Sequence, residues 1–359
     1  MKLAVIFGGE SDEHEVSRNS AVNVLKNLEG GDHEIFQIGI SRQGSWYLTD
    51  ATYADIASGE WENYDSNRQV CFTCNPAYPG LVIIDRDGNA VLERIDCVIP
   101  VLHGDHGEDG EIQGVFEMTD IPYVGPGVKA SANCMDKSVA KALAASTGVT
   151  MAKHYLVTKQ AYEADPAGVI AAAARVDGGR FPLFVKPSSA GSSVGVTKVT
   201  EESGLGAAIE LALKFDSKAL VEECIVGREL EVAVLGNLDP EASDVGEILT
   251  AGEFYDYESK YNNPESRTWI PDDLPEGVSD EIRGYAVEIF KALECRGLSR
   301  VDFFYSEDKG VVFNEVNTLP GFTDISMYPQ LWAARGVDGP ALVEKLIELA
   351  IAEHDSKLR

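Results

Sequence analysis

The stretch from residue 300 to residue 326 constrains the fold more than any other, and it reads RVDFFYSEDKGVVFNEVNTLPGFTDIS. Two apolar runs flank the turn-like segment SEDKG, which predicts an antiparallel β-hairpin. Side chains alternate between the two faces of a strand. Arg300 and Asp302 therefore share a face of the first strand, and Glu315 and Asn317 share a face of the second. If these faces coincide, two carboxylates, an amide and a guanidinium meet at one point.

This predicted cluster suggests a metal site, because hard oxygen ligands suit Mg2+, which also binds substrate phosphates. The chain then leaves the hairpin through the Pro-Gly turn at Pro320 and Gly321. Backbone N–H groups after such a turn can face an anion, and glycine permits close approach. A metal beside backbone donors and an arginine is what phosphoryl transfer requires. The alternative is a solvated edge hairpin whose charges face water.

Length, net charge and cysteine content limit the number of domains, the binding partners and the cellular compartment that are expected for the chain. A length of 359 residues exceeds what one compact core usually holds, so two or three domains are expected. The net charge of -29 argues against binding to nucleic acid or to anionic membranes, and no apolar run is long enough to span a bilayer. The start of the chain fits a buried strand better than a signal peptide, and cysteines are sparse. A cytoplasmic protein with reduced thiols is the expectation. Cys71 and Cys74 form one CxxC pair, but no second pair lies at zinc-site spacing.

The first hundred residues alternate strand and helix patterns, which predicts a doubly wound parallel sheet. Residues 2–7 read as a buried strand, and a helix follows the GGES turn with Ser11 or Asp12 as its cap. Ligands of such sheets bind beyond the carboxyl ends of the strands, where GGESDEHEVS and HGDHGEDGEIQG lie. Glu13 either complements the helix dipole or holds a substrate ammonium. In the second motif a zinc site is one possibility, but glycine density favours backbone shape, with His103 as a polar group lining the crevice.

Two strand-like runs, FPLFVKP and GVTKV, bracket the flexible segment SSAGSSVG. Its backbone N–H groups and hydroxyls can bind phosphate oxygens, with Lys186 at the base of this predicted flap. An ordinary glycine-serine hairpin loop is the alternative. Further on, residues 252–275 are long, polar and aromatic, which favours an ordered lid.

Seven motifs, in order and spacing, resemble the D-alanine–D-alanine ligase family of the ATP-grasp superfamily. They are GGESDEHEVS, HGDHGEDGEIQG, MDK, FVKPSSAGSSVG, FYDYESKY, SRVDFF and NEVNTLPGFTDIS, and they extend over nearly the whole chain. The resemblance implies an α/β protein of three domains, α+β in its two ATP-grasp halves. The expected boundaries are an N-terminal doubly wound domain over 1–133, a central subdomain with the phosphate flap over 134–222, and a C-terminal subdomain with lid and metal site over 223–359.

The resemblance also implies an activity, which is ATP-dependent ligation of two D-alanines through D-alanyl phosphate for peptidoglycan precursor synthesis. It implies Mg2+ or Mn2+, two ions, and a homodimer joined through the N-terminal domain. The implied catalytic residues are Glu13, Ser192, Tyr261, Arg300 and Gly321. The implied substrate contacts are His103, Lys260, Ser326 and Met327. The implied ATP contacts are Lys137, Lys186, Ser193, Glu222, Cys224, Ile225, Glu229, Phe304 and Asn314. The implied metal ligands are Asp302, Glu315 and Asn317.

In this family Glu13, Ser192 and Tyr261 correspond to a hydrogen-bonded trio that joins helix, flap and lid. Relatives that make a D-alanine–D-lactate ester lack a tyrosine at this position, so Tyr261 favours an amine nucleophile. Three alternatives stay open. The chain could be a D-alanine–D-serine ligase or another dipeptide ligase, or a nucleotide-binding regulator that has lost turnover.

Overall fold

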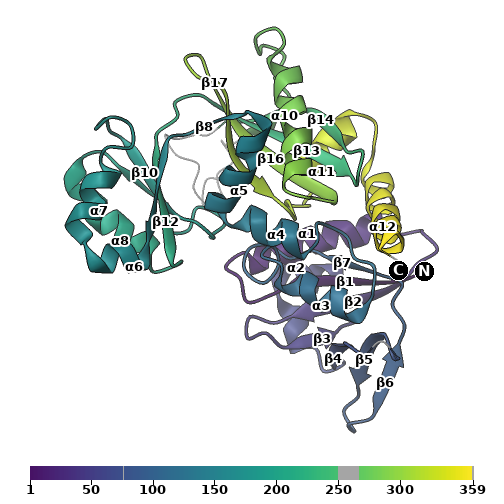
Figure 1. Ribbon diagram of the computed structural model, residues 1–359. Coiled ribbons are helices and arrows are strands. Elements are labelled where there is room, and N and C mark those ends of the chain that lie inside the picture. Colours follow the sequence, from purple (N-terminus) through teal and green to yellow (C-terminus); the bar gives the residue numbers. More distant parts are fainter. Residues whose placement is uncertain (76, 250–266, 358–359) are drawn as a thin grey trace.

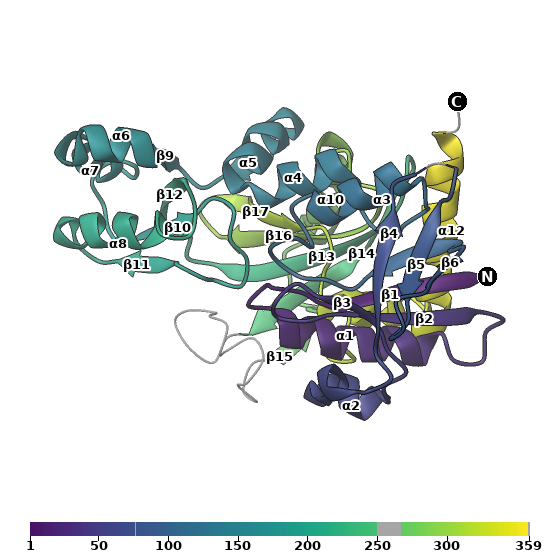
Figure 2. The ribbon, with the colours of Figure 1, turned by 90° about the horizontal axis from the view of Figure 1, so that it is seen from below.

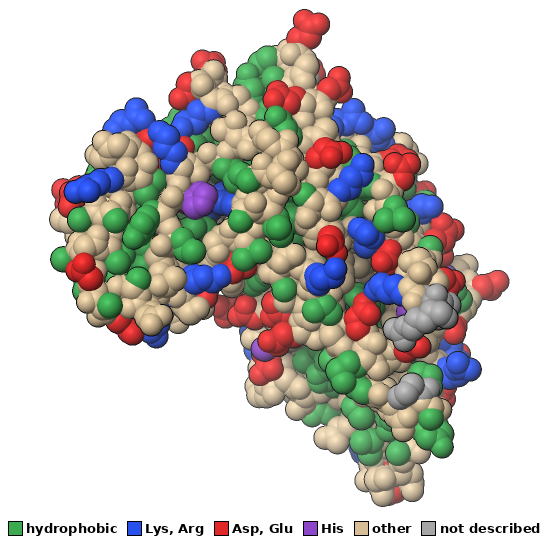
Figure 3. Space-filling model, in the orientation of Figure 1, with side chains coloured by type: hydrophobic (Ala, Val, Ile, Leu, Met, Phe, Trp, Pro, Cys, Tyr) green, Lys and Arg blue, Asp and Glu red, His purple; other side chains and the backbone are tan. Residues whose placement is uncertain are grey.

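The computed structural model describes residues 1–75, 77–249 and 267–357, and within them the strands form three sheets (Figures 1 and 2). A rounded central module projects from the rest of the molecule, with a recess beneath it (Figure 3). On the face shown there, basic and acidic side chains are interspersed. No helix among the described residues has both the length and the apolar character needed to cross a membrane.

The first sheet has the order β6-β5-β4-β3-β2-β1-β7 in the described chain. Its strands are β1 (Lys2–Gly8), β2 (Glu34–Ile40), β3 (Trp46–Leu48), β4 (Arg68–Thr73), β5 (Gly80–Ile84), β6 (Ala90–Glu93) and β7 (Cys97–Pro100). β1 runs parallel to β2 and β7, as predicted, whereas β3 to β6 extend the sheet in antiparallel fashion. Short turns join β2 to β3 and β5 to β6, and such turns permit only antiparallel pairing. The parallel arrangement predicted for the whole sheet therefore holds for three of its strands.

Helices α1 (His14–Asn27), α2 (Tyr53–Ser58) and α3 (Glu111–Thr119) belong to this sheet, together with the short helix η1 (Glu60–Asn63). Glu13 is the N-cap of α1, so the predicted cap at Ser11 or Asp12 was wrong. The GGES turn is longer than expected, because the Ser11 carbonyl accepts the His14 N–H and the Ser11 hydroxyl accepts the Glu13 N–H. This extra turn places Glu13 at the very start of the helix.

The second sheet is antiparallel and has the order β11-β10-β12-β9. Its strands are β9 (His154–Thr158), β10 (Leu183–Pro187), β11 (Thr197–Val199) and β12 (Lys218–Glu223). The helices α6 (Lys159–Ala164), α7 (Pro166–Ala173) and α8 (Leu205–Ala212), with η3 (Glu202–Gly204), pack on it. The buried side chains of this module, such as Val157, Val185 and Ile209, form a core of their own.

The third sheet has the order β15-β14-β13-β16-β17-β8 in the described ranges. Its strands are β8 (Thr150–Met151), β13 (Arg228–Gly236), β14 (Glu241–Leu249), β15 (Arg267–Trp269), β16 (Gly297–Ser306) and β17 (Gly310–Asn317). One face is covered by α4 (Val128–Met135), α5 (Lys137–Ala144), η2 (Ala145–Thr147) and α10 (Val278–Ala292). Helices α11 (Met327–Ala334) and α12 (Gly339–Ser356) pack with the other face.

The strands of the third sheet alternate between these two cores, as strands covered on both faces must. Val232 and Val234 of β13 point to the core with α10, whereas Ala233 points to the core with α11 and α12. That second core also contains Leu3 and Val5 of β1. The first and third sheets are therefore joined by one continuous apolar interior.

Candidate active site

The predicted hairpin is confirmed as β16 and β17, which pair antiparallel. Their register places Arg300 opposite Asn317 and Asp302 opposite Glu315, so all four side chains start from one face of the sheet. Glu231 on the neighbouring strand β13 lies opposite Asp302 and adds a third carboxylate. The convergence expected from the period-two pattern is therefore present, with one carboxylate more than the sequence assigned to the cluster.

Arg300 is the half-buried centre of this cluster. Its Nε and Nη2 atoms donate to the two Asp302 oxygens at 2.8 and 2.7 Å, and its Nε lies 3.2 Å from Glu231 Oε1. Asn317 Nδ2 also donates to Asp302 Oδ2, at 2.9 Å. Burial alone would lower the pKa of Arg300, but the charges of Asp302 and Glu231 raise it well above its usual range. The guanidinium is therefore held charged beside the carboxylates.

The donor set fits a hard divalent cation. Asp302 and Glu315 supply carboxylate oxygens and Asn317 an amide oxygen, which are the ligand types that Mg2+ and Mn2+ prefer. In the structure two protein cations neutralise these carboxylates, because Lys137 Nζ lies 3.3 Å from Glu315 Oε2 while Arg300 binds Asp302. The negative charges of Asp302 and Glu315 are thus balanced by the positive charges of neighbouring side chains.

The predicted flap connects β10 and β11 and reaches across to α1. Ser192 and Ser193 have positive φ angles of 47° and 60°, a conformation that serine seldom adopts. The Ser192 hydroxyl donates to Glu13 Oε1, so helix and flap meet as the resemblance implied. The third member of that trio, Tyr261, lies outside the described residues, as does Lys260. Lys137 Nζ donates to the Ala190 carbonyl at 2.7 Å, which ties the flap to α5.

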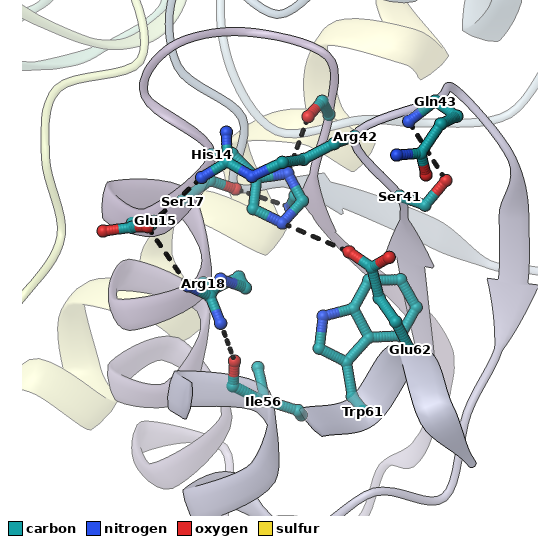
Figure 4. A network of polar contacts seen from close by, with 12 residues as sticks. His14, Glu15, Ser17, Arg18, Ser41, Arg42, Gln43, Ile56, Trp61 and Glu62 are labelled. Carbon is teal, nitrogen blue, oxygen red and sulfur yellow. Dashed lines mark hydrogen bonds and ion pairs between the residues drawn. The ribbon is translucent and has the colours of Figure 1, made fainter. Parts of the chain in front are cut away.

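The start of α1 is anchored by a buried polar network (Figure 4). His14 Nδ1 lies 2.6 Å from the Gly9 carbonyl, and its Nε2 lies 3.7 Å from Glu62. Burial lowers the pKa of His14. Arg18 donates to the Ile56 carbonyl at 3.2 Å. These contacts join α1 to the segment of α2 and η1, and they fix the helix turn that carries Glu13.

A cavity of about 570 Å³ opens between the second and third sheets. The predicted site residues that line it are Lys137, Lys186, Ser192, Ser193, Glu222, Cys224, Ile225, Glu229, Asp302, Phe304, Asn314 and Glu315. Two expected metal ligands, Asp302 and Glu315, thus share one cavity with the residues expected to bind a nucleotide. Asn317 and Arg300 do not line this cavity.

Sequence reasoning missed Lys141, which is buried at the wall of this cavity. Its Nζ lies 3.1 Å from Glu222 Oε1, and Lys186 Nζ lies 2.7 Å from Glu222 Oε2. Burial alone would raise the pKa of Glu222, but Lys141 and then Lys186 lower it to about 2. The spacing from Lys137 could have revealed Lys141, because residues four apart lie on the same side of a helix.

His103 lies outside this cavity, at the junction of three segments. Its Nδ1 is 2.9 Å from the Leu319 carbonyl oxygen and its Nε2 is 3.1 Å from Ser20 Oγ, and burial lowers its pKa. Glu108, which the sequence did not single out, accepts the N–H groups of Gly104 and Leu319, both at 3.0 Å. Burial and then the charge of Glu13 raise the pKa of Glu108 to about 7.

The chain after the hairpin brings Gly321 and Ser326 close together. A Cβ atom at Gly321 would lie 3.0 Å from Ser326 Oγ, which itself accepts the Thr323 N–H at 3.0 Å. Met327 begins α11 with a buried side chain that packs against Gly246 of β14. Its side chain belongs to the core and does not line the 570 Å³ cavity, and the expected contact of Met327 with a substrate stays a prediction.

The motif HGDHGEDGEIQG gathers one further set of potential ligands. Atoms of His106, Asp109 and Glu111 lie within 4.8 Å of one another, in the motif where the sequence left a zinc site as one possibility. His103 does not belong to this set. His106 Nδ1 already pairs with Glu111, and Asp109 accepts two backbone N–H groups. The group is accounted for by hydrogen bonds within its own loop.

The second sheet is antiparallel and carries the serine-rich flap, and it faces the paired carboxylates of the third sheet, with lysines between them. This arrangement defines an ATP-grasp enzyme. The family models described as D-ala D-ala ligase N-terminus and D-ala D-ala ligase C-terminus match residues 2–126 and 143–348. The chain belongs to the D-alanine–D-alanine ligase family.

Individual relatives align over essentially the whole chain. The D-alanine–D-alanine ligase of Acetivibrio thermocellus is 46% identical, over 100% of this chain and 98% of that protein. The one of Clostridium acetobutylicum is 42% identical, over 99% of each. Among solved structures, the VanG D-Ala:D-Ser ligase of Enterococcus faecalis has a TM-score of 0.86 and 40% identity, over 97% of this chain and 99% of that one. The D-alanine–D-alanine ligase of Coxiella burnetii has a TM-score of 0.86 and 35% identity, over 99% and 95%.

Proposed function

We propose that the chain joins two D-alanines at the expense of ATP, giving D-alanyl-D-alanine, ADP and phosphate for peptidoglycan precursor synthesis. The observation that carries this proposal is the convergence of Asp302, Glu315 and Lys137 in one cavity, with Arg300 bound to Asp302 and with a lining flap that reaches Glu13. A phosphate donor and an amino acid can meet there.

The first half of the reaction forms an acyl phosphate. A carboxylate oxygen of the first D-alanine attacks the γ-phosphorus of ATP, and the bond to ADP breaks. Glu13 holds the ammonium of that D-alanine, and Ser192 orients the Glu13 carboxylate through its hydrogen bond. Lys137 and Lys186 face the cavity and bind phosphate oxygens. A divalent ion on Asp302, Glu315 and Asn317 neutralises the triphosphate when bound.

The second half forms the peptide bond. The amine of the second D-alanine attacks the acyl carbon, and phosphate leaves after the tetrahedral intermediate collapses. Arg300 and the Gly321 N–H stabilise the negative charge that builds on the carbonyl oxygen. Ser326 and the Met327 backbone hold the carboxylate of the second D-alanine, and His103 lies beside the first subsite. Closing the flap and lid excludes water, which protects the acyl phosphate from hydrolysis.

A second candidate substrate for the second subsite is D-serine in place of D-alanine. The similarity to the VanG D-Ala:D-Ser ligase of Enterococcus faecalis makes D-serine the specific alternative, because that protein is 40% identical to this chain. An apolar pocket rejects one added hydroxyl poorly. D-Alanine remains our proposal for the second subsite, and Tyr261 supports an amine over a hydroxyl nucleophile.

Further features complete the proposal. We place the domain boundaries at 133/134 and 222/223, two Mg2+ or Mn2+ ions at the hairpin, and the enzyme in the cytoplasm. We also propose a homodimer that forms through the N-terminal domain.

The decisive experiment measures phosphate release over a panel of D-amino and D-hydroxy acids. We expect release to require ATP, Mg2+ and D-alanine together, and L-alanine should not substitute. Mass analysis of the product distinguishes D-alanyl-D-alanine from D-alanyl-D-serine when both amino acids are present. A preference for D-lactate over D-alanine near neutral pH would refute the argument from Tyr261, and ATP turnover indifferent to D-alanine would refute the proposed function.

A further inference from the structure

The backbone of the turn around Gly321 is held at both flanks by side chains that are buried or half-buried. Before the turn, His103 Nδ1 lies 2.9 Å from the Leu319 carbonyl oxygen. After the turn, Ser20 Oγ accepts the Phe322 N–H at 3.1 Å, and Asn23 Nδ2 donates to the Phe322 carbonyl at 2.8 Å. Ser20 and Asn23 both belong to α1, so a helix that packs on the first sheet is hydrogen-bonded to the turn that follows β17 of the third sheet.

Ser20 is the residue that links these two flanks. The Leu319 carbonyl can only accept, so His103 Nδ1 carries the hydrogen, and in the neutral ring His103 Nε2 is then the acceptor. Ser20 Oγ, 3.1 Å from Nε2, then donates its hydroxyl hydrogen to the ring and still accepts the Phe322 N–H. One arrangement of hydrogens therefore satisfies every contact. It uses the neutral imidazole, which burial favours by lowering the pKa of His103.

These contacts matter because the two central residues of the turn, Pro320 and Gly321, do little to hold its backbone in place. Pro320 has no N–H, so it contributes no backbone donor. Gly321 lacks a Cβ, and its peptide group can rotate more freely than that of any other residue. Contacts at Leu319 and Phe322 are thus what fixes the direction of the Gly321 N–H.

We propose that Ser20 is a positioning residue for the ligation reaction, holding the Gly321 N–H in its direction through the Phe322 amide and His103. This inference rests on the proposed function, which gives Gly321 its role at the acyl carbon. Ser20 itself touches neither the nucleotide cavity nor the metal ligands in the described structure. Its effect should therefore fall on the chemical step and not on ATP binding.

Ser17 provides a matched control on the same helix. Both serines are fully buried, and each makes two hydrogen bonds. Ser17 Oγ accepts the Gly8 N–H at 2.8 Å and donates to the Val101 carbonyl, so it joins α1 to the ends of β1 and β7. Neither bond involves the turn from Leu319 to Phe322. Replacing either serine by alanine removes similar buried bonds, but only one replacement loosens the turn.

The test compares Ser20→Ala with Ser17→Ala in the full-length enzyme by two readouts. In Ser20→Ala we expect kcat for D-alanine-dependent phosphate release to fall about tenfold, the effect of losing one buried hydrogen bond to an oriented group, with the KM for ATP unchanged. In Ser17→Ala kcat should stay within about twofold of the wild-type value. The melting temperature should fall by a similar amount in Ser17→Ala and in Ser20→Ala, because the two variants lose comparable hydrogen bonds. If Ser20→Ala does not fold, Ser20→Cys, which keeps the side-chain size, serves for the same comparison.

The second readout is hydrogen exchange, which does not depend on turnover. Amides of residues 321–324 should exchange faster in Ser20→Ala and remain as in the wild type in Ser17→Ala. Equal kcat in the two variants, or unchanged exchange in Ser20→Ala, would overturn the role of Ser20. A wild-type enzyme without D-alanine-dependent phosphate release would instead defeat the proposed function, and the exchange result would still decide whether Ser20 holds the turn.

Discussion

Replacing Lys141 by methionine tests whether the buried pair with Glu222 shapes the nucleotide cavity. Lys141 is 1% exposed and lies 3.1 Å from one Glu222 oxygen, while Lys186 lies 2.7 Å from the other. Methionine fills a similar volume, so the change removes charge with little loss of packing. Glu222 then keeps one partner in place of two.

The expected magnitude follows from the burial of the pair. Removing one partner of a buried ion pair destabilises a protein by about 3–5 kcal/mol when the other charge is left alone. Because Lys186 still neutralises Glu222, we expect a smaller loss of about 2 kcal/mol in the free energy of unfolding. Glu222 lines the cavity, so a less fixed carboxylate should also raise the KM for ATP about tenfold.

Urea unfolding and ATP titrations at saturating D-alanine measure these two effects. Lys129→Met is the matched control, because Lys129 also pairs with a glutamate but is 77% exposed, and exposed pairs contribute little. A double-mutant cycle with Glu222→Gln isolates the interaction energy. The reasoning is refuted if Lys141→Met behaves like Lys129→Met, or if the effects of Lys141→Met and Glu222→Gln simply add.

Two more predictions concern the hairpin and the base of the flap. Glu315→Gln should lower D-alanine-dependent turnover by roughly a hundredfold, since the substitution removes a negative charge that attracts the divalent ion, whereas Glu307→Gln at the exposed turn of the same hairpin should not. An unchanged rate in Glu315→Gln would remove the metal assignment. Asp136 caps α5 and pairs with Lys218; burial would raise its pKa, but Lys218, Ser138 and Ser188 lower it from 3.8 to about 2. Because the folded pKa is depressed, the stabilisation is present above pH 3.8 and is lost as the pH falls through about 2. Asp136→Asn should therefore reduce unfolding free energy by about 2 kcal/mol at pH 7, with the difference vanishing near pH 2 in urea titrations. A difference that did not change with pH would contradict this account.

Local patterns in the sequence predicted the hairpin, because alternation with period two directly determines which side chains share a face. Arg300, Asp302, Glu315 and Asn317 were therefore found together. The pairing of Arg300 with Asp302 was less visible, since a sequence pattern does not reveal which cation neutralises a carboxylate before a ligand binds. Lys141 was missed for a related reason, as its partner Glu222 lies eighty-one positions away on another element.

Longer-range arrangements were harder to predict. Residues 46–93 contain short strands of three to six residues, too brief to show clear alternation, and they extend the first sheet with antiparallel strands. The anchoring of Gly321 by Ser20 and His103 also joins segments about three hundred positions apart. No local spacing indicates such contacts. They emerge only when α1, β7 and the chain after β17 are brought together by folding.

The continuous interior shared by the first and third sheets has a mechanical consequence. Leu3, Val5 and Leu25 are packed in one cluster with Leu342 and Leu346 of the final helix, whereas the central module has its own separate cluster. In the described residues the first and third sheets thus pack as one unit, and the central module packs as a second, smaller unit. The hydrogen bond from Ser192 to Glu13 connects these two units. Any movement of the central module away from α1 breaks this bond, so the carboxylate that we propose for the substrate ammonium also joins the two units.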